Sequence, residues 1–255
     1  MGLDIYAGTM TRYYARNWLT SVQQWGLEHG MQVNIVRPEG QEDENIASPE
    51  EIIAGVTDWR RGLIEWLGDN IEGEPHWSED NDATPYYTDK PDWDAAEALL
   101  LYACAKWLGK EPPATVRKNF DVYETELYKE FTERKQGAVS LFDSELWWLP
   151  LNDPLMFRVP LPTGQEKTLS TVGMLKLELD AINAIEWNAS EEEIISWRDS
   201  EGYPDDAYYS KEKGLQMLEK HDEFDTVSLA KFAFSILWQA VTFAQEHGTC
   251  VIFDY

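Results

Sequence analysis

The chain has 255 residues, 43% hydrophobic and 27% charged, a composition that can bury a core and that is typical of a folded protein rather than a disordered one. Its 47 acidic residues outnumber its 21 lysines and arginines and give a formal net charge of −26, which disfavours nucleic acid and anionic lipid as partners. Only Cys104 and Cys250 are present, which excludes a disulfide framework and a zinc site made of cysteine alone.

The first forty residues predict a strand, a helix and a second strand. Residues 3–7 (LDIYA) have the composition of a strand. After them, apolar residues recur at the spacing of one helix, at Tyr14, Trp18, Val22 and Trp25. Gly30 is placed to end that helix in the left-handed conformation, and residues 32–36 resume a strand pattern.

Several helices are predicted along the middle of the chain. The clearest signal is Ser48-Pro49-Glu50-Glu51, a capping box with proline at the first helical position, which precedes an apolar stripe ending at Trp66. A second capping box, Ser190 with Glu193, precedes another helix. Apolar periodicity predicts further helices over residues 94–108, 120–131 and 172–182.

A hairpin and a closing helix and strand complete the pattern. Residues 155–161 and 166–169 flank a Pro-Thr-Gly-Gln turn, and Pro160 and Pro162 confine the first of these strands to a sheet edge. Residues 229–243 have helical spacing, Gly248 ends the helix, and residues 250–253 predict a strand. We expect the strands near residues 3, 33 and 251 to share one sheet.

These elements predict an α+β fold that is predominantly α-helical, with a small sheet from the N-terminal and C-terminal strands plus the mid-chain hairpin. Residues 94–108 and 232–244 are apolar nearly all round and predict two buried helices at its centre. We expect a single domain over residues 1–255, with a long acidic loop at about residues 69–93. The start of the chain has no export signal, and Lys231 and Gln239 interrupt the most apolar stretch, so we expect a cytoplasmic protein outside the membrane.

Acidic and aromatic residues gather in two segments. Residues 72–94 hold eight carboxylates against Lys90 alone, and residues 199–209 repeat that composition. The chain is also rich in tryptophan, with 12 residues, and tryptophan and tyrosine are effective anchors in interfaces. The predicted binding residues are Trp77, Glu79, Asp80, Asp82, Tyr86, Tyr87, Asp205, Asp206, Tyr208 and Tyr209.

Four interpretations of these segments stay open. Asp80, Asp82 and Thr84 alternate as in a calcium loop, but Pro85 stands where that loop needs glycine, and we predict no metal and no cofactor. Aromatic faces beside carboxylates also suit glycans, and carboxylates steer the association of basic proteins. The fourth possibility is a solvated loop whose aromatic side chains pack back onto the body.

Arg12 and Arg16 form a basic spot in this acidic chain. They lie one turn apart on the first predicted helix and are expected to face the same side. They either bind a small anion or form ion pairs with the surplus carboxylates.

Two resemblances involve the N-terminus. The segment GLDIYAGT resembles the first phosphate loop of the sugar kinase and actin superfamily, which implies phosphate near Gly8 and magnesium near Asp4; Tyr6 stands where that family has glycine, and one extra residue separates Asp4 from Gly8. The longer segment MGLDIYAGTMTRYYARNW is similar to the start of a group of uncharacterised bacterial proteins of unknown function. That resemblance implies a bacterial or phage origin and no activity.

The function that these features favour is an acidic protein-interaction module, an inhibitor or immunity-like protein for a basic partner. The alternative is a carboxylate-dependent enzyme or binder that acts on a neutral or glycan-like ligand. The sequence identifies no catalytic residue and leaves the oligomeric state open.

Overall fold

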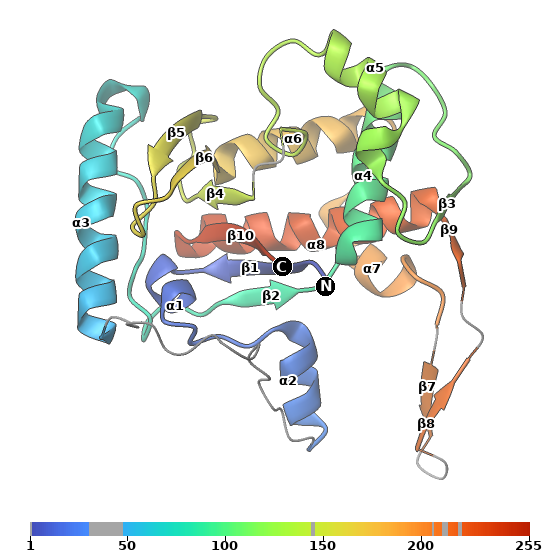
Figure 1. Ribbon diagram of the computed structural model, residues 1–255, viewed down its shortest axis with the longest axis horizontal. Coiled ribbons are helices and arrows are strands. Elements are labelled where there is room, and N and C mark those ends of the chain that lie inside the picture. The colour runs from blue at the N-terminus through green and yellow to red at the C-terminus, as the bar shows by residue number, and fades with distance from the viewer. Residues whose placement is uncertain (1, 31–47, 144–145, 206, 211–213, 219–220) are drawn as a thin grey trace. The chain divides into compact units, whose positions relative to one another are not determined.

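The structure is a computed structural model that describes residues 2–30, 48–143, 146–205, 207–210, 214–218 and 221–255. Its helices and strands form a mixed α+β fold, as the sequence predicts (Figure 1). The chain divides into two units, which we call the sheet unit (residues 4–90, 143–177 and 240–255) and the helical unit (residues 1–3, 91–142 and 178–239). The division falls within helices α6 (Val172–Ile185) and α8 (Thr226–His247).

The sheet unit contains a six-stranded sheet in the order β2-β1-β10-β4-β6-β5 (Figure 1). Its strands are β1 (Asp4–Gly8), β2 (Tyr87–Asp89), β4 (Trp147–Leu149), β5 (Met156–Pro160), β6 (Glu166–Thr171) and β10 (Cys250–Asp254). Neighbouring strands are antiparallel except β4 and β6. The predicted pairing of the first and last strands is confirmed, with Gly8 opposite Cys250. The strand predicted over residues 32–36 lies outside the described residues.

The mid-chain hairpin is confirmed as β5 and β6, which pair with Phe157 opposite Leu169. Gly164, with φ +83, permits the tight turn between them, and its N–H donates to the Leu161 carbonyl at 2.8 Å. β5 lies at the edge of the sheet, where Pro160 has no ladder bond to donate.

The predicted first helix is wrong in its extent, because two helices replace it: α1 (Met10–Tyr14) and α2 (Ser21–Glu28). Arg16 has φ +53, a left-handed conformation that ends α1. Thr20 then starts α2 through a capping box with Gln23. Local capping chemistry therefore overrides the continuous apolar spacing, and α2 ends as predicted before Gly30, at φ +71.

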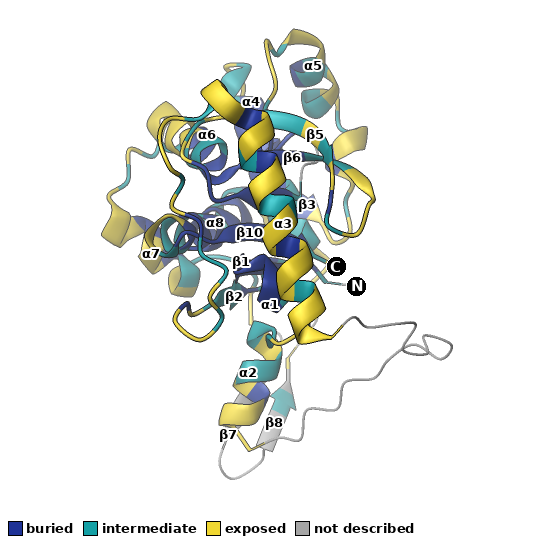
Figure 2. Cartoon of the chain, turned by 90° about the vertical axis from the view of Figure 1, so that its left-hand side faces the viewer, coloured by how far each residue is buried: buried dark blue, intermediate teal, exposed yellow. Residues whose placement is uncertain are grey.

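Helix α3 (Pro49–Leu67) begins at the predicted capping box of Ser48 and Glu51 and is followed by the 3-10 turn η1 (Gly68–Asn70). Its buried residues Val56, Leu63 and Leu67 belong to the core of the sheet unit. The other buried members of that core are Tyr6, Met10, Trp77, Trp147, Leu149, Leu151, Leu161, Leu169, Cys250 and Ile252. Figure 2 shows the exposed outer face of α3 and the buried strands β1 and β10.

The helical unit contains α4 (Asp92–Trp107), α5 (Glu126–Arg134), α7 (Glu191–Ser200) and the 3-10 turn η2 (Val122–Glu124). Two strand pairs belong to it: β3 (Thr115–Arg117) with β9 (Glu223–Asp225), and β7 (Ala207–Ser210) with β8 (Gly214–Met217). The helix predicted over residues 120–131 is wrong in its first half. Asp121 caps η2, and Thr125 starts α5 by accepting the Tyr128 N–H at 3.3 Å.

Among the described residues, α8 is the one helix long and apolar enough to cross a membrane by length and composition. Its most apolar window has a mean hydropathy index of 1.4, and 61% of that window is buried within the protein. Burial of that extent is typical of a core helix, which passes the same test of composition.

Candidate functional site

The acidic loop predicted from the sequence belongs to the sheet unit and has neither helix nor strand over residues 71–86. We call this segment the acidic loop. Its side chains divide into two sets. Trp77, Glu79 and Asn81 are buried or half-buried and bond to Thr9, to α1 or to one another, whereas Glu72, Glu74, Asp80 and Asp82 are exposed.

Glu79 is held by donors from α1 and from the loop itself. Its Oε2 accepts the Thr11 backbone N–H at 2.9 Å, and its Oε1 accepts the Trp77 indole N–H at 2.8 Å. Trp77 is 5% exposed, and its ring meets that of Trp59 edge to face with centroids 6.0 Å apart. Both predicted binding residues therefore fix the loop to the core.

Asn81 makes the second attachment. The hydroxyls of Thr9 and Thr11 both donate to its Oδ1, and Arg12 Nη2 donates to its backbone carbonyl. Arg12 is 8% exposed, and its guanidinium carbon lies 5.1 Å from the centroid of the Tyr86 ring. The loop is thus joined to the turn between β1 and α1 by side chains about seventy positions away.

Tyr86 and Tyr87 also turn toward the body of the sheet unit. The Tyr86 hydroxyl accepts the Leu19 N–H at 3.2 Å, and the Tyr87 ring lies 6.1 Å from that of Phe243 at the end of α8. Both side chains are half-buried. The aromatic residues of this segment therefore pack back onto the body of the sheet unit.

The exposed carboxylates form the outer set of the loop. Asp80 Oδ1 accepts the N–H groups of Asp82 and Ala83 at 3.0 and 3.1 Å, which closes a tight turn at the loop's tip. Glu72, Glu74 and Asp82 have no ion pair in the part of the chain that the structure describes. No cation of the described residues therefore compensates their negative charge, and they lie exposed on a segment that Glu79 and Asn81 attach to α1.

The alternating residues of the loop do not converge as calcium ligands. The Asp80 carboxylate serves the turn, and the Thr84 hydroxyl bonds to that of Ser78 at 2.7 Å. The structure, over its described residues, contains no group of three or more side chains able to hold a metal ion.

Arg16 does not join Arg12, although the sequence predicted that both face one side of a helix. α1 ends at Tyr14, and Arg16 follows it, exposed and in the left-handed conformation. Arg12 alone is buried in the network of the acidic loop. The predicted placement of both arginines on one helix is wrong because α1 ends before Arg16, and anion binding by the two stays a prediction.

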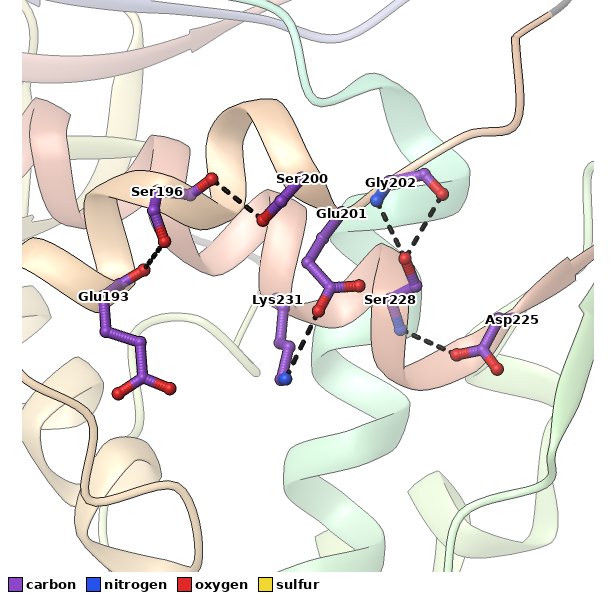
Figure 3. Close-up of polar contacts among 8 residues, drawn as sticks. All are labelled: Glu193, Ser196, Ser200, Glu201, Gly202, Asp225, Ser228 and Lys231. Carbon is purple, nitrogen blue, oxygen red and sulfur yellow. Dashed lines mark hydrogen bonds and ion pairs between the residues drawn. The ribbon is translucent and has the colours of Figure 1, made fainter.

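The second acidic segment, residues 199–209, belongs to the helical unit, and its described part is tied down by the start of α8 (Figure 3). The Gly202 N–H donates to Ser228 Oγ at 2.9 Å, and Asp225 caps α8 by accepting the Ser228 N–H at 2.8 Å. Glu201 pairs with Lys231 at 3.3 Å. Gly202 has φ +113, and a Cβ there would lie 2.9 Å from the Phe232 ring.

Tyr203 extends this attachment to α4. Its hydroxyl accepts the Ala95 N–H at 3.0 Å and donates to the Pro91 carbonyl at 3.3 Å. Asp205 is exposed. Asp206 lies outside the described residues, as do the side chains of Tyr208 and Tyr209, whose backbones pair in the β7–β8 hairpin. The two acidic segments belong to different units, and each is considered on its own.

Two further carboxyl groups of the helical unit, those of Glu97 and Glu178, were not predicted from the sequence. Glu97 Oε2 accepts the Val122 N–H at 2.9 Å, and burial raises the pKa of Glu97 to about 7, with Asp121 and Asp94 adding to the increase. Glu178 is 6% exposed and accepts the N–H groups of Ser140 and Leu141 at 2.5 and 3.1 Å. In the sequence, Glu178 is marked by being a lone glutamate among the apolar residues of the helix predicted over residues 172–182.

Comparison of the chain with models of protein families, with curated proteins and with solved structures gives no match. Function is therefore argued from the geometry of the described residues.

Proposed function

We propose that the chain is an acidic, cytoplasmic protein-interaction module whose acidic loop docks against a basic surface of another protein, in the manner of an inhibitor or immunity-like protein. The observation that carries the proposal is the division of the loop into two sets. Trp77, Glu79 and Asn81 anchor it inward, while Glu72, Glu74 and Asp82 stay exposed without cations among the described residues.

This division suits electrostatic docking for two physical reasons. A loop already fixed by its anchors loses little conformational entropy when a partner binds, so less of the interaction energy is spent on ordering. Uncompensated carboxylates on a chain of net charge −26 attract a basic surface over long range and accelerate its encounter. Since Trp77, Tyr86 and Tyr87 face inward, the loop supplies charge rather than aromatic contact area.

We propose that the protein is predominantly helical around two buried helices, α4 and α8, which would give the second acidic segment a firm base. Residues 98–105 of α4 are all buried, and Ser228 and Lys231 of α8 hold the segment at Gly202 and Glu201.

The test is capture of partners on the immobilised chain from a bacterial lysate, followed by binding kinetics with each purified partner. The loop variant is Glu72→Gln/Glu74→Gln/Asp82→Asn; Asp80 is kept because its carboxylate closes the turn. The control, Glu65→Gln/Glu133→Gln/Glu246→Gln, removes the same charge from exposed positions on α3, α5 and α8. We expect a basic protein to be retained at low salt and released as salt rises, with its association slowed about tenfold or more by the loop variant alone.

Two results would overturn the proposal. The first is that no basic protein is retained at low salt. The second is that both triple variants slow association equally, because the effect would then come from net charge and not from the loop.

A further inference from the structure

Arg12 carries a buried charge that no carboxylate of the described residues neutralises. Its side chain is 8% exposed, and no ion pair joins it to an acidic residue in the described part of the chain. The nearby Glu79 gives its two oxygens to the Thr11 N–H and the Trp77 indole. Arg12 Nη2 donates to the Asn81 carbonyl, and Nη1 is buried without a hydrogen-bond partner among the described residues.

This arrangement is unusual for so acidic a chain. A guanidinium stays protonated at every physiological pH, so burial cannot be relieved by loss of the proton. A buried charge is tolerated when it is paired and hydrogen-bonded. Although the sequence has 47 acidic residues, no carboxylate of the described residues pairs with Arg12, and one NH2 group of its guanidinium is left without an acceptor among them.

A second polar group on α1 lacks a hydrogen-bond partner among the described residues. The hydroxyl oxygen of Tyr14, on the same short helix as Arg12, is buried and unpaired. Helix α1 therefore has two buried polar groups without partners among the described residues, and one of them belongs to a charged guanidinium.

We propose that Arg12 anchors a binding site for a small carboxylate at the turn between β1 and α1, with the oxyanion accepting hydrogen bonds from Arg12 Nη1. A ligand with one negative charge suits the site better than a ligand with two, because Glu79 lies in the same network and the net charge of the chain repels anions. The site uses none of the carboxylates proposed to dock a partner, since Arg12 is buried and those carboxylates are exposed.

The experiment measures thermal unfolding of the full chain with sodium acetate, sodium phosphate or sodium chloride at matched ionic strength, with isothermal calorimetry of acetate binding. Arg12→Met removes the charge. Arg12→Lys keeps the charge but lacks the planar guanidinium with its forked N–H donors. Arg16→Met is a control at an exposed position. In the wild type and in Arg16→Met, acetate raises Tm saturably above the chloride reference and binds more tightly than phosphate. Arg12→Met loses the acetate shift while keeping a cooperative transition, and Arg12→Lys binds acetate about tenfold more weakly.

Three results would overturn the proposal: no saturable acetate shift in the wild type, an equal loss in Arg16→Met, or a crystal structure grown in acetate that shows a single water at Arg12 Nη1. If Arg12→Met fails to fold, the calorimetric comparison of wild type with Arg12→Lys decides the question. Equal acetate affinity in those two proteins would contradict a site anchored by the arginine fork.

Discussion

Backbone N–H groups donate to three buried or half-buried carboxylates of this fold. Glu79 accepts the N–H of Thr11, Glu97 that of Val122, and Glu178 those of Ser140 and Leu141. With 21 basic residues for 47 acidic ones, the chain has too few cations to pair with every carboxylate. Backbone N–H groups do not depend on the number of lysines and arginines, because every residue except proline has one.

Glu97 makes the stability of the helical unit depend on pH. Its folded-state pKa is raised from 4.5 to about 7, so the folded protein holds this proton more tightly than the unfolded chain. The resulting stabilisation is fully present below about pH 4.5 and is lost as the pH rises through about 7. In Glu97→Gln the amide does not titrate and its oxygen still accepts the Val122 N–H. We therefore expect the stability of the wild type relative to Glu97→Gln to fall between about pH 5 and pH 8 in urea unfolding.

The control for this prediction is Glu133→Gln, at an exposed position on α5. Its unfolding free energy should follow that of the wild type across the same pH series. A constant difference between wild type and Glu97→Gln would contradict the assignment of this proton to Glu97.

At the scale of single residues, the sequence identified where polar and aromatic residues gather but not how they bond. Trp77, Tyr86 and Glu79 were predicted as binding residues, and the structure uses all three to attach the acidic loop. The reason is that the partners of this loop, Thr9, Thr11 and Arg12, lie about seventy positions earlier. No local pattern relates two such segments.

At the scale of elements, the contact between Ser228 and Gly202 joins the end of α7 to the start of α8 (Figure 3). Ser228→Ala removes the acceptor of the half-buried Gly202 N–H and is expected to lower the unfolding free energy by about 1–2 kcal/mol. The measurement is urea denaturation followed by circular dichroism.

Ser200→Ala is the matched control, on a neighbouring helix. The Ser200 hydroxyl is exposed and donates to the Ser196 carbonyl within its own helix, at 2.9 Å. Its loss should change stability by less than about 0.5 kcal/mol. An equal cost for both serines would show that the contact between the two helices contributes no more than a bond within one.

The helices and strands that the sequence predicted correctly have strong signals within a few residues. Helix α3 begins at the predicted capping box of Ser48. Gly30 and Gly248 have the predicted left-handed conformation after their helices, and the strand that ends in Pro160 lies at the edge of the sheet. The three-residue strands β2, β3, β4 and β9 were missed, because so short a segment shows no periodicity and its partner is distant in sequence. The division of the first helix at Arg16 was missed because the apolar spacing continues across it.

At the scale of the whole molecule, a net charge of −26 should oppose the compact state through mutual repulsion. Raising the ionic strength from about 0.01 M to about 1 M shortens the range of that repulsion from about 30 Å to about 3 Å. We therefore expect the thermal unfolding midpoint to rise with sodium chloride.

The loop variant Glu72→Gln/Glu74→Gln/Asp82→Asn supplies the comparison for this prediction. It carries three fewer negative charges, so its midpoint should begin higher at low salt and rise less. A midpoint that falls with salt in the wild type would show that attractive charge pairs outweigh repulsion. The single domain expected over residues 1–255 stays a prediction.

The pairing of β1 with β10 also links the order of folding to the order of synthesis. Gly8 and Cys250 are neighbours in the sheet but 242 positions apart in the chain, so a ribosome working at roughly 5–20 residues per second separates their appearance by roughly 10–50 seconds. During that interval one edge of β1 has no strand to pair with. The sheet unit must therefore complete its fold after residue 254 has left the ribosome, when the segments of the helical unit have already been made.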